Sequence, residues 1–432
     1  MTEPSQHTAR RAVIAGSVGN FIEWYDFAAY AYLGVVLGKV FFHAGDPFSA
    51  FLDAFGVYAS SYVVRPVGAA ILGRLGDRWG RKPTLLVTLI GMCAATGLIG
   101  VLPSYATAGA LAPALLVVLR VVQGLSAGGE FGGAVSLMAE FAPPGRRGLY
   151  GSWQSFTVGL GLLAGSGFAT LLTSTLRADA LASWGWRLPF LAAILFGLIA
   201  TYLRRRVDET PAFLRLREQP EHTSTGQPLH FPAPTWVLVL FVIGALLAWT
   251  TAGNVFLVVL PSYAAATLHL AAGLAQWLSF TANAVFTATI PLFGLLSDRL
   301  GRRTVMLTGA ALILALSYPL FLAINSGSTG LMFACAATAG AAVAMLAGPG
   351  PAMLAELFPA RVRVTGLGLG YALSAAAFGG TAALIIAGLK VLTGDPLAAA
   401  YYPIIGGIVS LICLAMLRRT ERDPLPEDRP CA

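Results

Sequence analysis

The chain alternates long apolar stretches with short polar segments. A helix needs about 20 apolar residues to cross the roughly 30 Å hydrocarbon core of a bilayer. Most of the apolar stretches reach that length, so the pattern predicts twelve transmembrane helices. The predicted spans are 12–38, 51–74, 84–102, 111–138, 149–174 and 188–204, followed by 235–260, 272–296, 304–324, 329–355, 364–389 and 399–417.

One longer polar stretch, rich in proline, threonine and charge, divides the twelve spans into two sets of six. We therefore expect a first half at residues 1–204, a cytoplasmic linker at 205–233 and a second half at 234–418. A short cytoplasmic tail at 419–432 would follow. The predicted fold class is an all-α polytopic membrane protein with two pseudo-symmetric halves of six helices.

The sequence repeats itself at a distance of about half the chain. GRLGDRWGRK at 73–82 reappears as GLLSDRLGRR at 294–303, each between the second and third spans of its half. LMAEFAPPGRRG at 137–148 matches MLAELFPARVRVTG at 353–366 in the same way. Two parallel six-helix halves that enclose a site near the bilayer midplane are a known transporter plan.

The composition agrees with a lipid-embedded chain. It is 56% hydrophobic and 11% charged, whereas soluble chains carry about 25% charge. The four cysteines share no metal-ligand spacing, so we expect neither a metal nor a cofactor. No GxxxxGK[ST], HExxH or GxSxG motif occurs, which disfavours nucleotide-driven transport and hydrolase activity. We expect a protein that is not an enzyme.

The net charge of +8 reflects topology and not nucleic-acid binding. Lys39, Arg177, Arg187 and Lys390 fall on one predicted side, and Arg65 and Arg120 fall inside spans. All other lysines and arginines fall on the side shared by the two termini. By the positive-inside rule we expect both termini to be cytoplasmic. The expected location is the plasma membrane, of a bacterial cell, with several spans crossing it. The first apolar run holds acidic residues and precedes no cleavage site, so we expect a retained helix.

Charged and polar side chains inside the spans are the candidates for function. Glu23 and Asp26 lie three residues apart in GNFIEWYDF, hence on one side of a helix. A charge at the centre of a transmembrane helix costs roughly 2.5 to 3.5 kcal/mol, so these residues predict a function. The candidates for proton coupling and substrate binding are Glu23, Asp26, Arg65, Arg120, Gln123 and Glu130.

Their roles stay open at this stage. Arg120 could instead extend to the membrane surface, and Arg65 could only support a salt bridge. The proton carrier is one of Glu23, Asp26 and Glu130, with Glu130 preferred.

The second half has no charged residue in the interior of its predicted spans. Its polar residues would supply shape and hydrogen bonds to a substrate, although a single Trp or Tyr is often an interfacial residue. The possible contacts are Asn254, Asn283 and Tyr371.

The two repeated loops predict a conformational latch. Glycines allow a tight turn and close approach, an aspartate can accept from backbone N–H groups, and the basic residues face the cytoplasm. Glu140 and Glu356 end their spans beside arginines and would support this gate. The gating residues are Gly73, Asp77, Arg78, Gly80, Arg81, Lys82, Asp298, Arg299, Arg302, Arg303, Glu140 and Glu356.

These motifs resemble a known family. The paired GxxxDxxGRK loops and RVVQG resemble the major facilitator superfamily. Six further segments resemble its metabolite:proton symporters: GNFIEWYDF, VVRPVG, QGLSAGGEFGGA, WGWRLPF, DETPAF and LAELFPARVRVTG. The resemblance implies twelve helices, alternating access and uptake of a small polar metabolite with a proton. It also implies that the gating loop is formed by Asp77, Arg78, Arg81 and Lys82. Arg120 and Glu130 would then lie on the face that binds substrate or couples transport to the proton.

The resemblance leaves alternatives. Members carry organic acids of the di- and tricarboxylate type, which we expect first, or zwitterions such as proline and betaine. The best-known proline/betaine members end in a long heptad-patterned tail, which this chain lacks. A proton antiporter that exports a drug is a second class, disfavoured because the fifth span lacks the glycine-proline signature of exporters. A membrane sensor without transport is a third. The expected partners are a small-molecule substrate, a proton and the lipid bilayer, with no nucleic acid, and the oligomeric state is unknown.

Overall fold

A computed structural model describes residues 6–42, 56–143, 145–205, 235–260, 263–264, 270, 272–359, 362–395 and 397–417. These residues are mostly helical and contain no strand. The expected linker at 205–233 lies outside the described residues except for Arg205, and the expected tail at 419–432 lies wholly outside them.

The first half is built from six long helices, with short helical turns at one end. Its second span is helical at 56–63 and continues as α4 after a turn at Val64. The elements are α1 (Gln6–Tyr32), α2 (Gly34–Phe41), α4 (Arg65–Trp79), α5 (Arg81–Gly100), α6 (Tyr105–Ala108), α7 (Leu111–Phe141), α8 (Arg147–Thr175), α9 (Ala178–Ala180), η1 (Leu181–Gly185) and α10 (Arg187–Arg205).

The second half repeats this plan with more interruptions. Its first span changes to a π-helix at η3, its fourth breaks before Gly350, and its fifth is interrupted by the π-helical η4. The elements are α12 (Thr235–Gly253), η3 (Asn254–Val259), α14 (Ala272–Leu300), α15 (Arg302–Ile324), α16 (Thr329–Ala347), α17 (Gly350–Leu357), α18 (Arg363–Ser374), η4 (Ala375–Gly379), α19 (Ala382–Thr393), η5 (Ala398–Ala400) and α20 (Tyr401–Met416).

The prediction of twelve spans in two halves is confirmed. Within the described ranges, nine helical segments are long and apolar enough to cross a bilayer by themselves. The other three spans are formed by α1, by residues 56–79 with a turn at Val64, and by α18, η4 and α19. None of them meets that criterion within the described residues.

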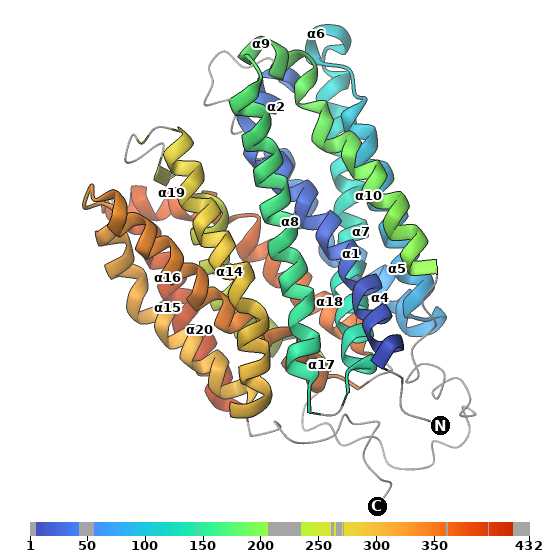
Figure 1. The fold of residues 1–432 in the computed structure, drawn as a ribbon, viewed down its shortest axis with the longest axis vertical. Coiled ribbons are helices and arrows are strands. Elements are labelled where there is room, and N and C mark those ends of the chain that lie inside the picture. The colour runs from blue at the N-terminus through green and yellow to red at the C-terminus, as the bar shows by residue number, and fades with distance from the viewer. Residues whose placement is uncertain are drawn as a thin grey trace, which may run out of the picture.

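The two halves stand side by side (Figure 1). α8 of the first half packs along α14 of the second, and α4 packs along α18. Gly80 and Gly301 occupy matching places in the two repeated loops, with φ of 112° and 95°. That backbone conformation favours glycine, so the repeat extends to the turn geometry. We call the end that carries these turns, with Arg81, Arg146 and Arg302, the arginine-rich end.

The fifth span, α8, uses its glycines to approach α1. A Cβ on Gly161 would lie 2.5 Å from the Phe21 carbonyl oxygen, and one on Gly165 would lie 2.6 Å from that of Tyr25. Small residues at helix interfaces let membrane helices pack closely. The backbone of α1, which bears Glu23 and Asp26, is therefore held directly against α8.

The outer surface is apolar. On α10, Leu195, Leu198 and Ile199 are each more than half exposed. The opposite side of that helix is buried, including Phe190 and Ala193. An apolar outer face suits lipid as the surrounding solvent, and the chain is an integral membrane protein.

We predict that Gly165→Val destabilises the protein by about 1–3 kcal/mol, because the side chain would overpack the contact between α8 and α1. Gly167→Val is the matched control on the same helix, since a Cβ there meets nothing within 4 Å. Thermal unfolding of the two purified variants in detergent measures the difference. Equal melting temperatures would contradict the packing role of Gly165.

Candidate functional site

Three carboxylate–guanidinium pairs lie buried in the first half. Their side chains are at most 3% exposed. Burying a charge is costly unless an opposite charge and hydrogen bonds compensate it. The pairs are Glu23–Arg65, Asp26–Arg120 and Glu130–Arg204.

The first pair joins α1 to α4. Arg65 Nη2 lies 2.9 Å from Glu23 Oε1. The guanidinium carbon of Arg65 is 4.5 Å from the ring centre of Phe27 and 4.3 Å from that of Tyr62. Tyr371, on α18 of the second half, also contacts this guanidinium. The cation–π contacts with Phe27 and Tyr62 help to hold this desolvated cation, and Tyr371 interacts with it from the other half.

The second pair joins α1 to α7. Arg120 Nη1 donates to Asp26 Oδ2 at 2.8 Å, and the guanidinium carbon lies 3.7 Å from the ring centre of Tyr30. Arg120 is fully buried and does not extend to the membrane surface. Gln123, one turn along α7, donates to the Thr96 hydroxyl at 2.6 Å. The predicted group of Asp26, Arg120 and Gln123 is therefore brought together.

The third pair joins α7 to α10, and its Glu130 carboxylate interacts electrostatically with Glu23. Arg204 donates to both carboxylate oxygens of Glu130 and to the Leu85 carbonyl oxygen. The Thr88 hydroxyl donates to the same carboxylate at 2.7 Å. A Cβ on Gly19 would overlap both members of the pair, so glycine is required where α1 crosses it.

Arg204 is a buried residue that the sequence interpretation missed. It opens the run Arg204–Arg206 and was counted with the cytoplasmic arginines. The helical periodicity of α10 contains the missing signal, because a residue three or four positions after a buried one faces the same side. The buried positions of α10 are Pro189, Phe190, Ala193, Gly197, Ala200 and Arg204.

A cavity of about 60 Å³ lies between the two halves. Tyr62 and Tyr371, which both contact Arg65, form part of its wall. The Glu23–Arg65 pair therefore lies directly behind the cavity. The aromatic residues of the lining are Trp24, Tyr62, Trp249, Phe286 and Tyr371.

Two of the three contacts predicted in the second half line this cavity. They are Asn254 and Tyr371. Asn283 is buried elsewhere, where its amide donates to the carbonyl oxygens of Leu257 at 2.9 Å and Ser279 at 3.0 Å. The bond to Leu257 ties α14 to the π-helical segment η3, so Asn283 supports the cavity wall from behind.

The two repeated loops make matching contacts across the halves. Asp77 accepts from the backbone N–H groups of Val364 at 3.2 Å and Thr365 at 3.0 Å, at the start of α18. Asp298 accepts from the N–H groups of Gly148 at 2.7 Å and Leu149 at 2.9 Å, at the start of α8. A carboxylate is stabilised at a helix N-terminus by its unpaired donors and by the helix dipole. Each half thus caps a helix of the other.

Buried arginines reinforce these contacts. The Glu140 carboxylate lies 3.1 Å from Arg81 and 3.0 Å from Arg363, and therefore bridges the two halves. In the second half, Arg302 lies 3.1 Å from Glu356 and 3.4 Å from Asp298.

The remaining gating residues lie around this network. Arg303 donates to the carbonyl oxygens of Leu414 and Ala415. A Cβ on Gly73 would lie 2.9 Å from the Thr365 Cα, so α4 and α18 touch there. Three other predicted residues are basic and more accessible, with Arg78 and Arg299 exposed and Lys82 partly buried.

Metal binding gains no support from the described ranges, in which no group of three or more His, Cys, Asp and Glu could hold an ion.

Comparison with known proteins finds relatives over nearly the whole chain. A family described as "Sugar (and other) transporter" matches residues 12–227, and one described as "Major Facilitator Superfamily" matches residues 243–430. The chain is 33% identical to the proline/betaine transporter of Escherichia coli K12, over 98% of this chain and 86% of the relative.

Other relatives are named for organic acids. The chain is 34% identical to the alpha-ketoglutarate permease of Escherichia coli K12, over 96% of this chain and 95% of the relative. It is 33% identical to the citrate-proton symporter of Klebsiella pneumoniae, over 94% and 91%. A solved proton:xylose symporter bound to 6-bromo-6-deoxy-D-glucose matches with a TM-score of 0.81 at 18% identity, over 98% of both chains. That last likeness shows a common fold.

We predict that Arg204→Ala destabilises the protein by about 3–5 kcal/mol, because it leaves the Glu130 carboxylate buried without its counter-ion. Replacing both partners with apolar residues, as Glu130→Leu with Arg204→Met, should restore most of the loss. Arg205→Ala, at the exposed neighbouring position, is the matched control. Chemical unfolding in detergent measures all three, and a double variant no more stable than the single one would count against the pairing.

We also predict that Asp77→Asn weakens closure of the arginine-rich end, because it removes a negative charge worth about 0.3–2 kcal/mol at the start of α18. Spin labels at the exposed Trp79 and Leu300, in a chain without native cysteines, would report the separation of α4 and α14. The longer-distance population should grow, whereas Asp179→Asn, exposed on α9, should change nothing. An unchanged distance distribution in the Asp77 variant rules out the latch.

Proposed function

Because the chain belongs to the major facilitator superfamily of transporters, we propose that it takes up a small carboxylate-bearing metabolite together with a proton. Transport proceeds by alternating access, with the cavity between the halves as the substrate site. The arginine-rich end faces the cytoplasm by the positive-inside rule, and with it both termini. The contacts of Asp77, Asp298 and Glu140 then close the cytoplasmic side.

The observation that carries this proposal is the Glu23–Arg65 pair behind the cavity wall. Arg65 contacts two tyrosines that line the cavity, one from each half. When Glu23 binds a proton, its negative charge disappears and the Arg65 guanidinium loses its counter-ion. A substrate carboxylate can then replace it. Proton and substrate thus stabilise each other in the site, which is the energetic requirement for symport.

The geometry supports Glu23 as the proton carrier more directly than Glu130. Glu130 is bound by Arg204 and Thr88, which do not line the cavity between the halves. Arg65, the partner of Glu23, contacts the lining residue Tyr62. Asp26 and Arg120 sit next to Glu23 on the same side of the first half and would adjust its affinity for the proton. In this proposal the Glu130–Arg204 pair stabilises the contact of α7 with α10.

The lining favours a substrate with a single free negative charge, such as a zwitterion. No lysine or arginine lines the cavity, and protonation of Glu23 frees one guanidinium only. Tryptophan and tyrosine faces suit an ammonium or quaternary ammonium group through cation–π attraction. A proline- or betaine-like zwitterion therefore fits this wall. A di- or tricarboxylate is the second candidate, supported by relatives named for alpha-ketoglutarate and citrate.

Transport into vesicles tests the proposal. The purified chain would be reconstituted in liposomes with an acidic exterior and given labelled proline, betaine, 2-oxoglutarate or citrate. We expect proton-dependent accumulation of one of these, and its loss in Glu23→Gln with retention of substrate exchange, because exchange needs no net proton movement. Asp179→Asn, exposed outside the site, serves as the control.

The other outcomes separate the alternatives. Export driven by proton entry would identify an antiporter, and binding without flux would identify a sensor. Accumulation that persists in Glu23→Gln and disappears in Glu130→Gln would identify Glu130 as the proton carrier.

A further inference from the structure

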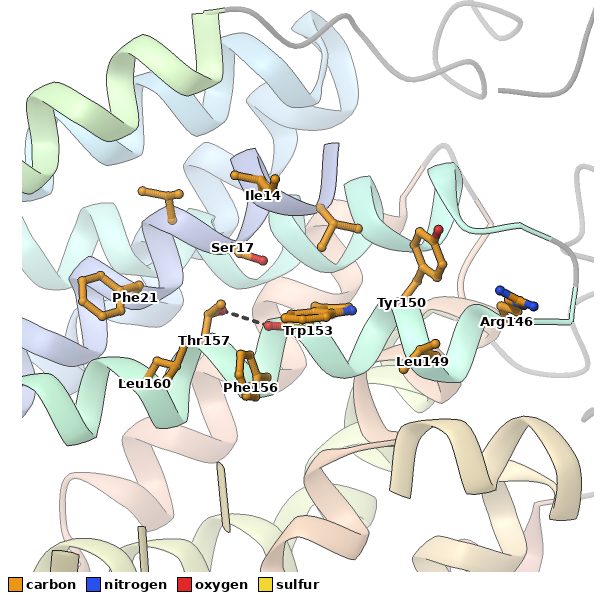
Figure 2. Close-up of a pocket in the computed structure, with 12 residues that line it drawn as sticks. Ile14, Ser17, Phe21, Arg146, Leu149, Tyr150, Trp153, Phe156, Thr157 and Leu160 are labelled. Atoms are coloured by element: carbon orange, nitrogen blue, oxygen red, sulfur yellow. Dashed lines mark hydrogen bonds between the residues drawn. The ribbon is translucent and has the colours of Figure 1, made fainter. Parts of the chain in front are cut away.

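A second cavity lies outside the site between the halves. It has a volume of about 630 Å³ and is lined by residues 13–21 of α1, by Arg146 and by residues 149–160 of α8, all within the first half. Figure 2 shows α1 on one side and α8 on the other, with side chains of both filling the space between them. Its size is that of a small-molecule site, for which about 300–1,000 Å³ is typical.

The groove opens to the outside of the bundle. Ile14 is 52% exposed, Leu160 is 37% exposed and Trp153 is 36% exposed. In a chain that spans a bilayer, apolar side chains on the outer face meet lipid. The occupant that reaches this groove most directly is therefore a lipid molecule.

One end of the groove carries a positive charge. Arg146, the exposed residue before α8, stands at the arginine-rich end with Tyr150 one turn further along (Figure 2). No described acidic residue forms an ion pair with Arg146. The first backbone donors of α8 are already bound by Asp298. A bound anion at this end would therefore be held by the Arg146 side chain.

A buried hydroxyl lies further in. Ser17 lines the groove, is 6% exposed, and its hydroxyl has no hydrogen-bond partner. Leaving a buried polar group unpaired costs about 1–3 kcal/mol. An acceptor oxygen on a molecule in the groove would remove that cost. Beyond Ser17 the lining is mainly apolar and includes Phe21, Phe156 and Leu160.

We propose that this groove binds one anionic glycerophospholipid of the leaflet at the arginine-rich end. The order of groups along the groove matches the order along such a lipid. Arg146 binds the phosphate, the Ser17 hydroxyl donates to an ester oxygen, and the apolar part holds an acyl chain. Residues 146 to 160 of α8 span about 21 Å at 1.5 Å per residue, which is longer than half of a hydrocarbon core of about 30 Å.

The test measures lipid binding to the full-length protein and does not use transport, so its failure is distinct from failure of the proposed function. The purified chain would be stripped of lipid in detergent and titrated with dioleoylphosphatidylglycerol, with retained lipid counted by native mass spectrometry. We expect one tightly held lipid per chain. Dioleoylphosphatidylcholine, which has the same tails but no net charge, should bind more weakly.

Variants address each part of the groove. Arg146→Gln should weaken binding about tenfold, as expected for loss of one charge-assisted contact, and Ser17→Ala should weaken it less. Leu160→Trp should block the acyl-chain part. The matched controls are Arg74→Gln, exposed on α4, and Leu171→Trp, exposed on α8 and outside the lining.

Three results would overturn the proposal. The first is wild-type lipid affinity in both Arg146→Gln and Leu160→Trp. The second is equal binding of the two lipids. The third is a protein that forms a dimer without bound lipid and becomes monomeric in Leu160→Trp, which would assign the groove to a second copy of the chain.

Discussion

The cost of placing ionised groups at membrane depth constrains this structure more than any other factor. An unpaired carboxylate or guanidinium there is strongly unfavourable. The first half meets the constraint by pairing every buried acid that the structure describes with an arginine from a different helix. Each pair therefore also acts as a tie between helices: α1 to α4, α1 to α7, α7 to α10 and, through Glu140 and Arg81, α7 to α5. The contacts that neutralise the buried charges are therefore also contacts that hold the helices together.

The two halves divide the remaining work. The first half holds the buried pairs near the cavity, whereas the second supplies aromatic and hydrogen-bonding wall residues such as Trp249 and Asn254. At the arginine-rich end the division disappears, since Asp77 and Asp298 cap helices of the opposite half in the same way. The symmetry of the repeat is thus retained where the halves must close and lost where the substrate must bind.

Much of this was predictable from residues alone. Apolar run lengths predicted the twelve spans, and the repeated loops predicted two equivalent halves, because both signals are local or internal to the sequence. The residue with which each charged side chain pairs was not predictable from the sequence. Asp77 meets Thr365 through docking of the halves, and Arg204 meets Glu130 because of how α10 is rotated, which a run of three arginines conceals. The eleventh span is interrupted after η4, at a turn over residues 380 and 381. The Gly379–Gly380 pair is a turn signal that the sequence interpretation did not use.

The pairing of buried charges has a consequence for the membrane potential. A unit charge moved through the whole field changes free energy by about 2.3 kcal/mol per 100 mV. The pairs Glu23–Arg65, Asp26–Arg120 and Glu130–Arg204 each have no net charge. Rocking of the empty halves would therefore move little charge of these pairs through the field and would depend only weakly on voltage. A zwitterion that enters with a proton adds one positive charge, whereas a monoanion with a proton adds none. The voltage sensitivity of the loaded carrier would then be a property of the substrate and not of the protein.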